Sequence, residues 1–165
     1  MTLPTAALLF LIPVSAPVQT PAPPPSPAIE YSDAYQMRAK VHKVGSFAML
    51  PLAGAEYLLG TSVYDGNTDK KGAHIAVGVG ISTLFAVNTV TGVWNLIESR
   101  NDPNGRTKRW VHAILMMGAD AGFVATFASA PGGLGSIDDR NTHRTLALTS
   151  LAVGTAGYLL MLLTK

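Results

Sequence analysis

Residues 73–97 read AHIAVGVGISTLFAVNTVTGVWNLI and contain no Asp, Glu, Lys or Arg. An α-helix rises about 1.5 Å per residue, so about 20 apolar residues are needed to cross the hydrocarbon core of a bilayer. This stretch is therefore predicted to be a transmembrane helix. Three further stretches have a similar length and character, namely residues 41–59, 110–130 and 145–163.

The composition agrees with a membrane protein, because 48% of the residues are hydrophobic and only 13% are charged. The net charge of +2 comes from basic residues at the ends of the apolar segments. No basic stripe interleaved with aromatic residues is present, which argues against nucleic acid as a partner. The absence of cysteine excludes disulfides, thiolate-ligated zinc, iron–sulfur clusters and covalently attached c-type haem.

Short connections separate the four apolar segments, and each contains residues typical of turns. These are Asp-Gly-Asn at 65–67, Asp-Pro-Asn-Gly at 102–105 and Pro-Gly-Gly at 131–133. Connections of this length force neighbouring helices to run antiparallel. The sequence therefore predicts an all-α fold, a transmembrane antiparallel four-helix bundle.

The N-terminal part of the chain differs from the rest. Residues 1–19 resemble a signal peptide or a membrane anchor, and residues 20–40 form a proline-rich spacer and a polar lead-in to the four-helix domain at 41–165. A signal peptide would place the spacer outside the cytoplasm. The surplus of Lys and Arg on the same side favours the reverse orientation, but we favour an exported spacer. We expect an integral protein of the bacterial inner membrane.

The sequence has four histidines, and each lies near the start of its own apolar segment. If the helices alternate in direction, His42 and His112 lie near one membrane surface, and His74 and His143 lie near the other. The first and third helices are diagonal in a four-helix bundle, as are the second and fourth, so each pair can converge on the central axis. Such a pair could hold a flat ligand with one axial site on each side, as in bis-histidine ligation of haem iron.

Two other interpretations of the histidines remain open. A histidine at a membrane interface commonly caps a helix or contacts lipid headgroups. A zinc site is less favoured than haem, because zinc gathers its ligands at one point, whereas these histidines are expected at opposite membrane surfaces.

Each histidine is followed 14 residues later by a residue on the same side of its helix. Fourteen residues climb about 21 Å, so each of these residues should lie beside the other histidine pair. We expect Glu56 and Asn88 to hydrogen-bond a ligand histidine or a haem edge, and Gly157 to let a porphyrin approach. Thr126 is the fourth member of the set, and ordinary contacts between helices are the alternative for all but Glu56.

Further charged residues lie close to the expected site. Lys43 and Arg144 directly follow histidines and are our first choices as partners of haem propionates, although anionic lipid headgroups would explain the same residues. Glu56 and Asp120 lie inside apolar segments, where ionisable groups are usually functional. Proton uptake coupled to haem reduction is one hypothesis, and a protonated side chain bonded to a neighbouring helix is the alternative that we favour for Asp120.

One histidine on each of four consecutive spans, pairing first with third and second with fourth, resembles the four-helix core of the eukaryotic-type cytochrome b561 family. The resemblance covers roughly residues 40–163. It implies two b-type haems (haem b) that carry electrons across the membrane, with His42 and His112 as ligands of one iron and His74 and His143 as ligands of the other.

These observations predict transmembrane electron transfer between a quinol or small-molecule reductant and an acceptor. The expected partners are membrane lipid, the reductant, and a redox partner protein or a larger membrane complex. The alternative is a haem-free membrane anchor or assembly subunit of a larger complex. The sequence contains no nucleophile motif or phosphate-binding loop, so an oxidoreductase activity of the chain itself stays an open question.

Overall fold

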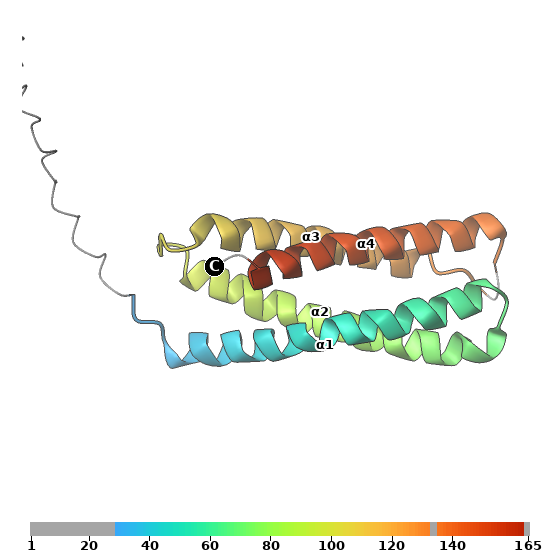
Figure 1. Cartoon of the computed structure of the whole chain (residues 1–165), viewed down its shortest axis with the longest axis horizontal. Helices are drawn as coiled ribbons and strands as arrows, with labels where there is room; N and C mark the ends of the chain where they lie inside the picture. The colour runs from blue at the N-terminus through green and yellow to red at the C-terminus, as the bar shows by residue number, and fades with distance from the viewer. Residues whose placement is uncertain (1–28, 133–134, 164–165) are drawn as a thin grey trace, which may run out of the picture.

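The computed structural model describes residues 29–132 and 135–163 of the chain. Within these ranges the protein is all-α and has no strand, which confirms the predicted fold class (Figure 1). The predicted signal segment at 1–19 and residues 20–28 of the spacer lie outside the described residues. The elements are α1 (Asp33–Tyr64), a short 3-10 turn (Thr68–Lys70), α2 (Lys71–Glu98), α3 (Arg106–Ala128) and α4 (Ile137–Leu163).

The four helices form two antiparallel hairpins that lie side by side (Figure 1). Helix α1 packs closely against α2, and α3 packs closely against α4. Contacts between the hairpins, made by α2 with α3 and by α1 with α4, are much sparser. The up-down-up-down order predicted from the short connections is thus present. The close packing lies within each hairpin rather than evenly around a bundle.

The helices begin earlier than the hydropathy pattern predicts, and for α1 and α4 capping residues explain why. The Ser32 hydroxyl accepts a hydrogen bond from the backbone N–H of Tyr35 at 3.1 Å, so α1 begins at Asp33 rather than at 41. In the same way, Ser136 and Asp139 form a reciprocal capping box that begins α4 at Ile137 rather than at 145. The histidines consequently lie within the helices, three to nine residues beyond the first residue.

Three helical segments are long and apolar enough to cross a membrane: Thr68–Glu98, Arg106–Ala128 and Ile137–Leu163. Helix α1 is long enough but is not among them, because Pro51, Glu56 and several glycines dilute its apolar run. The prediction of four membrane spans is therefore met by length and apolarity for three of the four.

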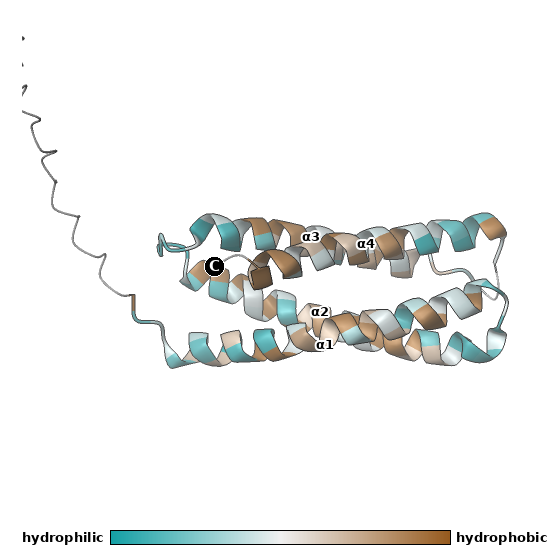
Figure 2. Cartoon of the chain, in the orientation of Figure 1, coloured by the Kyte–Doolittle hydropathy of each residue, from teal (hydrophilic) through white to brown (hydrophobic). Residues whose placement is uncertain are grey.

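Many apolar side chains are exposed on the surface of the molecule. Hydrophobic residues occur along every helix (Figure 2). Leu58 is 70% exposed, Val124 69% and Ile114 66%. A soluble protein rarely exposes so much contiguous apolar surface, whereas lipid would cover it. The buried core is small and consists of Ile81, Phe85 and Ala119.

Candidate cofactor site

The four histidines meet in two crosswise pairs. His42 on α1 faces His112 on α3 with ring centroids 6.1 Å apart and an angle of 78° between the planes. His74 on α2 faces His143 on α4 at the same separation of 6.1 Å, with an angle of 85°. Each pair joins one hairpin to the other along a diagonal. The structure therefore brings together the same two pairs that the alternating topology predicts.

Three of the four imidazoles use Nδ1 to contact a backbone carbonyl on the partner helix of their own hairpin. A carbonyl can only accept a hydrogen bond, so Nδ1–H donates, and the neutral ring then carries its lone pair on Nε2. This is the tautomer that a metal ligand needs. The contacts are His42 to Asn88 O at 2.9 Å, His112 to Gly157 O at 2.9 Å, and His143 to Thr126 O at 2.8 Å.

The fourth imidazole has a different partner. The Nδ1 atom of His74 lies 2.8 Å from Oε1 of Glu56, so its neighbour is a side-chain carboxyl group rather than a peptide carbonyl, and it has no partner in hydrogen-bond geometry among the described residues. The geometry again leaves Nε2 as the nitrogen available to a ligand.

All four residues in contact with an Nδ1 atom lie 14 positions after a histidine, and each contacts the other histidine layer, as the helical rise predicts. The contacts differ from the expectation at two positions, Asn88 and Gly157. Asn88 accepts through its backbone carbonyl, while its side-chain Nδ2 donates to Ser46 Oγ at 3.3 Å. Its Oδ1 is buried without a hydrogen-bond partner among the described residues.

Gly157 does not lie on the cavity between the hairpins. It is buried between α3 and α4, where a Cβ atom would lie 3.0 Å from Sδ of Met116 and 3.2 Å from Cβ of Leu115. Its observed role is close packing of these two helices, which brings its carbonyl to His112. The expected approach of a porphyrin to Gly157 is not supported by this position.

Two glycines, Gly92 on α2 and Gly60 on α1, lie against histidine rings. A Cβ atom on Gly92 would lie 3.0 Å from Cε1 of His42, and one on Gly60 would lie 3.3 Å from Cε1 of His74. Each glycine is 18 residues, or five helical turns, after the histidine of its own helix. Glycine at this spacing is the signal that could have identified them.

A cavity of about 460 Å³ lies between the two hairpins and is bounded by all four histidines. Apolar side chains form much of its wall, including Met49, Ile81 and Met116. Phe85 and Phe123 lie between the two histidine layers, with ring centroids 4.8 Å apart. Glu56 and Asn88 also line the cavity, so it combines two ligand pairs with a mostly apolar interior.

Basic side chains border the cavity at the His74/His143 end. The guanidinium carbon of Arg144 lies 4.6 Å from the ring centroid of Tyr64, and that of Arg140 lies 5.7 Å from it. Arg140 donates from Nη1 to the carbonyl of Tyr64 at 2.9 Å, and its Nε is buried without a partner within the described part of the chain. Both arginines line the cavity, whereas Lys43 is exposed on α1 and does not.

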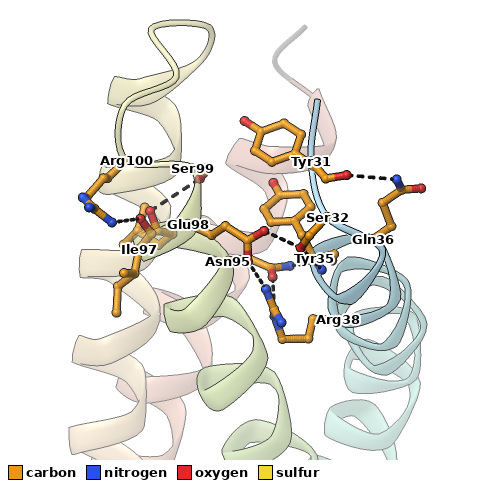
Figure 3. Close-up of polar contacts among 11 residues, drawn as sticks. Tyr31, Ser32, Tyr35, Gln36, Arg38, Asn95, Ile97, Glu98, Ser99 and Arg100 are labelled. Carbon is orange, nitrogen blue, oxygen red and sulfur yellow. Dashed lines mark hydrogen bonds and ion pairs between the residues drawn. The ribbon is translucent and has the colours of Figure 1, made fainter. Parts of the chain in front are cut away.

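A polar network closes the opposite end of the molecule, where the start of α1 meets the end of α2 (Figure 3). Ser32 donates to Glu98 at 2.5 Å, and Arg38 donates from Nε to Asn95 Oδ1 at 2.8 Å and from Nη2 to Glu98. This network holds the lead-in to the first helix on the second helix.

Tyr31 extends this network to the α2–α3 turn, because its hydroxyl donates to Asp102. Burial, together with the hydrogen bond to Asp102, raises the pKa of Tyr31 to about 12. The same hydrogen bond lowers the pKa of Asp102 below its ordinary value.

Asp120 lies away from the cavity. It accepts a hydrogen bond of 2.5 Å from the Thr89 hydroxyl, which links α3 to α2. This contact agrees with the interpretation of Asp120 as a side chain bonded to a neighbouring helix.

Among the residues that the structure describes, no group of three or more His, Asp or Glu side chains is arranged to hold a metal ion. No family model, curated protein or solved structure matches the chain.

Proposed function

We propose that the protein is a di-haem, b-type cytochrome of a membrane, which passes electrons from one membrane surface to the other. The observation that carries this proposal is the pair of diagonal histidine contacts, with three Nδ1 atoms bonded to peptide carbonyls of the neighbouring helix and the fourth 2.8 Å from a carboxyl oxygen. His42 and His112 would ligate one iron, and His74 and His143 the other.

The separation of the rings is compatible with this ligation. A ring nitrogen binds a metal at about 2 Å and lies about 1 Å from the centre of its own ring, so two opposed ligands put their ring centres about 6 Å apart. The observed separation is 6.1 Å in both layers. Two histidines that merely capped helices or contacted lipid headgroups would have no reason to meet at this distance in both layers.

The contacts around the rings also favour ligation. The Nδ1–H groups of His42, His112 and His143 are each donated to a peptide oxygen, which fixes the ring and directs Nε2 away from the helix that supplies the oxygen. The mostly apolar wall of the cavity would exclude water, while Arg140 and Arg144 at its end could neutralise carboxylate groups of a porphyrin. Bound at each pair, an iron porphyrin would supply reversible one-electron chemistry, which the side chains of this chain cannot.

The placement of the two layers supports transfer across a membrane. Residues 14 apart on one helix reach from one layer to the other, which is about 21 Å by helical rise. We place the protein in the bacterial inner membrane, with a quinol or small-molecule reductant as donor and a small molecule, a redox protein or a larger complex as acceptor. The resemblance to the cytochrome b561 family is part of this proposal.

The test is the optical spectrum of the full chain purified in detergent from cells supplied with a haem precursor. We expect the difference between dithionite-reduced and oxidised samples to show bands of low-spin b-type haem, with two haems per chain. His112→Ala and His143→Ala should each remove one haem. Asp120→Asn is a suitable control, because Asp120 does not line the cavity.

A colourless wild-type protein that does not take up added haem would contradict the proposal. In that case the helices would serve only for packing in the membrane, as in an anchor or assembly subunit of a larger complex.

A further inference from the structure

Glu56 makes the two histidine layers chemically different. In the His42/His112 layer, both Nδ1 atoms donate to peptide carbonyls. In the His74/His143 layer, His143 also donates to a carbonyl, but Nδ1 of His74 lies 2.8 Å from a carboxyl oxygen of Glu56 and has no partner in hydrogen-bond geometry among the described residues. The separations of the rings do not differ between the layers, so this neighbour is the clearest chemical difference between them.

The carboxyl group of Glu56 contacts His74. Its Oε1 lies 2.8 Å from His74 Nδ1, while Oε2 is buried and has no hydrogen-bond partner among the described residues. Gly78 on α2 makes room for this contact, since a Cβ atom there would lie 3.0 Å from Oε1.

A carboxyl oxygen attracts the Nδ1 proton more strongly than a peptide carbonyl does. Electron density consequently shifts toward Nε2, and the imidazole becomes a stronger donor to a metal. A stronger donor stabilises ferric relative to ferrous iron, so hydrogen bonding to an axial ligand is one of the means by which a protein sets a reduction potential.

We propose that Glu56 is a positioning residue that gives the His74/His143 site the lower of the two reduction potentials. This inference rests on the proposed di-haem function and adds a direction to it. Each electron from a quinol or small-molecule reductant would move in the favourable direction when it enters at the His74/His143 layer and leaves at the His42/His112 layer.

Redox titration of the wild-type protein and of two single-site variants tests the order of the potentials. His42→Ala retains the His74/His143 site alone, and His74→Ala retains the other site alone. We expect the midpoint of the first variant to match the lower wild-type midpoint, and that of the second to match the higher. The opposite order would overturn the inference.

Glu56→Gln tests the residue itself, because glutamine keeps the size and an oxygen acceptor but loses the carboxyl group. We expect the lower midpoint to rise by a tenfold change in the one-electron equilibrium, which is about 59 mV, and the higher midpoint to stay unchanged. The electron paramagnetic resonance signal of the same haem should shift as well. Asp120→Asn, a matched carboxyl-to-amide change that contacts no histidine, should move neither midpoint.

The outcomes separate this inference from the proposed function. Two bound haems with both midpoints unmoved in Glu56→Gln would overturn the role of Glu56 and leave the di-haem proposal intact. If Glu56→Gln loses the haem of the His74/His143 site, the order of the two midpoint potentials measured in the histidine variants decides whether the inference stands. A wild-type protein without haem would refute both proposals.

Discussion

Gly92 lies so close to His42 that a Cβ atom on the glycine would come within 3.0 Å of the imidazole Cε1. The ring of His42 is thus held between α2 and the facing ring of His112, while its Nδ1 donates to Asn88 O on α2. A larger side chain at position 92 would displace the ring from this position.

We therefore expect Gly92→Leu to destabilise the protein by about 1–3 kcal/mol, as overpacking of a close contact usually does. It should also lower the occupancy of the His42/His112 haem. Thermal unfolding in detergent and the haem-to-protein ratio measure the two effects. Gly80→Leu on the same helix is the control, because a Cβ atom on Gly80 meets no atom within 4 Å. Equal behaviour of the two variants would show that His42 tolerates displacement.

The sequence was sufficient to predict which histidines meet, because this follows from the order of the helices and the single histidine on each. It also predicted that positions 56, 88, 126 and 157 contact the histidines, because a period of 3.6 residues and a rise of about 1.5 Å fix height and side along a helix. The residues that contact the histidines could therefore be identified from the sequence alone.

The sequence did not predict which atom of each residue makes the contact. Asn88 has both a side-chain amide and a backbone carbonyl available, and the choice depends on how closely α1 and α2 approach, which Gly92 and Gly45 permit. Lys43 and Arg144 each follow a histidine directly in sequence, yet Arg144 lines the cavity while Lys43 is exposed on α1, so adjacency to a histidine does not by itself decide where the basic side chain lies.

Arg144 and Lys43 offer a direct comparison of a basic side chain at the cavity with one at the surface. If Arg144 pairs with a carboxylate of a bound porphyrin, Arg144→Ala should remove a charged hydrogen bond of about 1.5–3 kcal/mol, which weakens haem retention about tenfold or more. Lys43→Ala should leave retention unchanged. Transfer of haem to an excess of apomyoglobin gives the rate of loss for each variant, and equal rates would exclude Arg144 as the partner.

Phe85 fills the space between the histidine layers and contacts Phe123, so its removal should open the cavity core. We expect Phe85→Ala to cost about 3–5 kcal/mol in the free energy of unfolding, as truncation of a buried phenylalanine does elsewhere. Val79→Ala on the same helix should cost much less, because Val79 is 53% exposed on the outer surface. Unfolding in detergent by a chaotrope compares the two, and similar losses would show that the Phe85–Phe123 contact contributes little.

Tyr31 and Asp102 should make the stability of the N-terminal end depend on pH in two ranges. The folded pKa of Asp102 lies below its ordinary value because Tyr31 donates to it, so this contribution is present at neutral pH and is lost as the pH falls through the folded pKa. The folded pKa of Tyr31 is raised from 10.0 to about 12, so its contribution is complete below pH 10 and is lost as the pH rises toward 12. Tyr31→Phe should reduce both dependences, measured as the thermal midpoint from acidic to alkaline pH. An unchanged profile in this variant would show that the Tyr31–Asp102 contact does not anchor the start of α1.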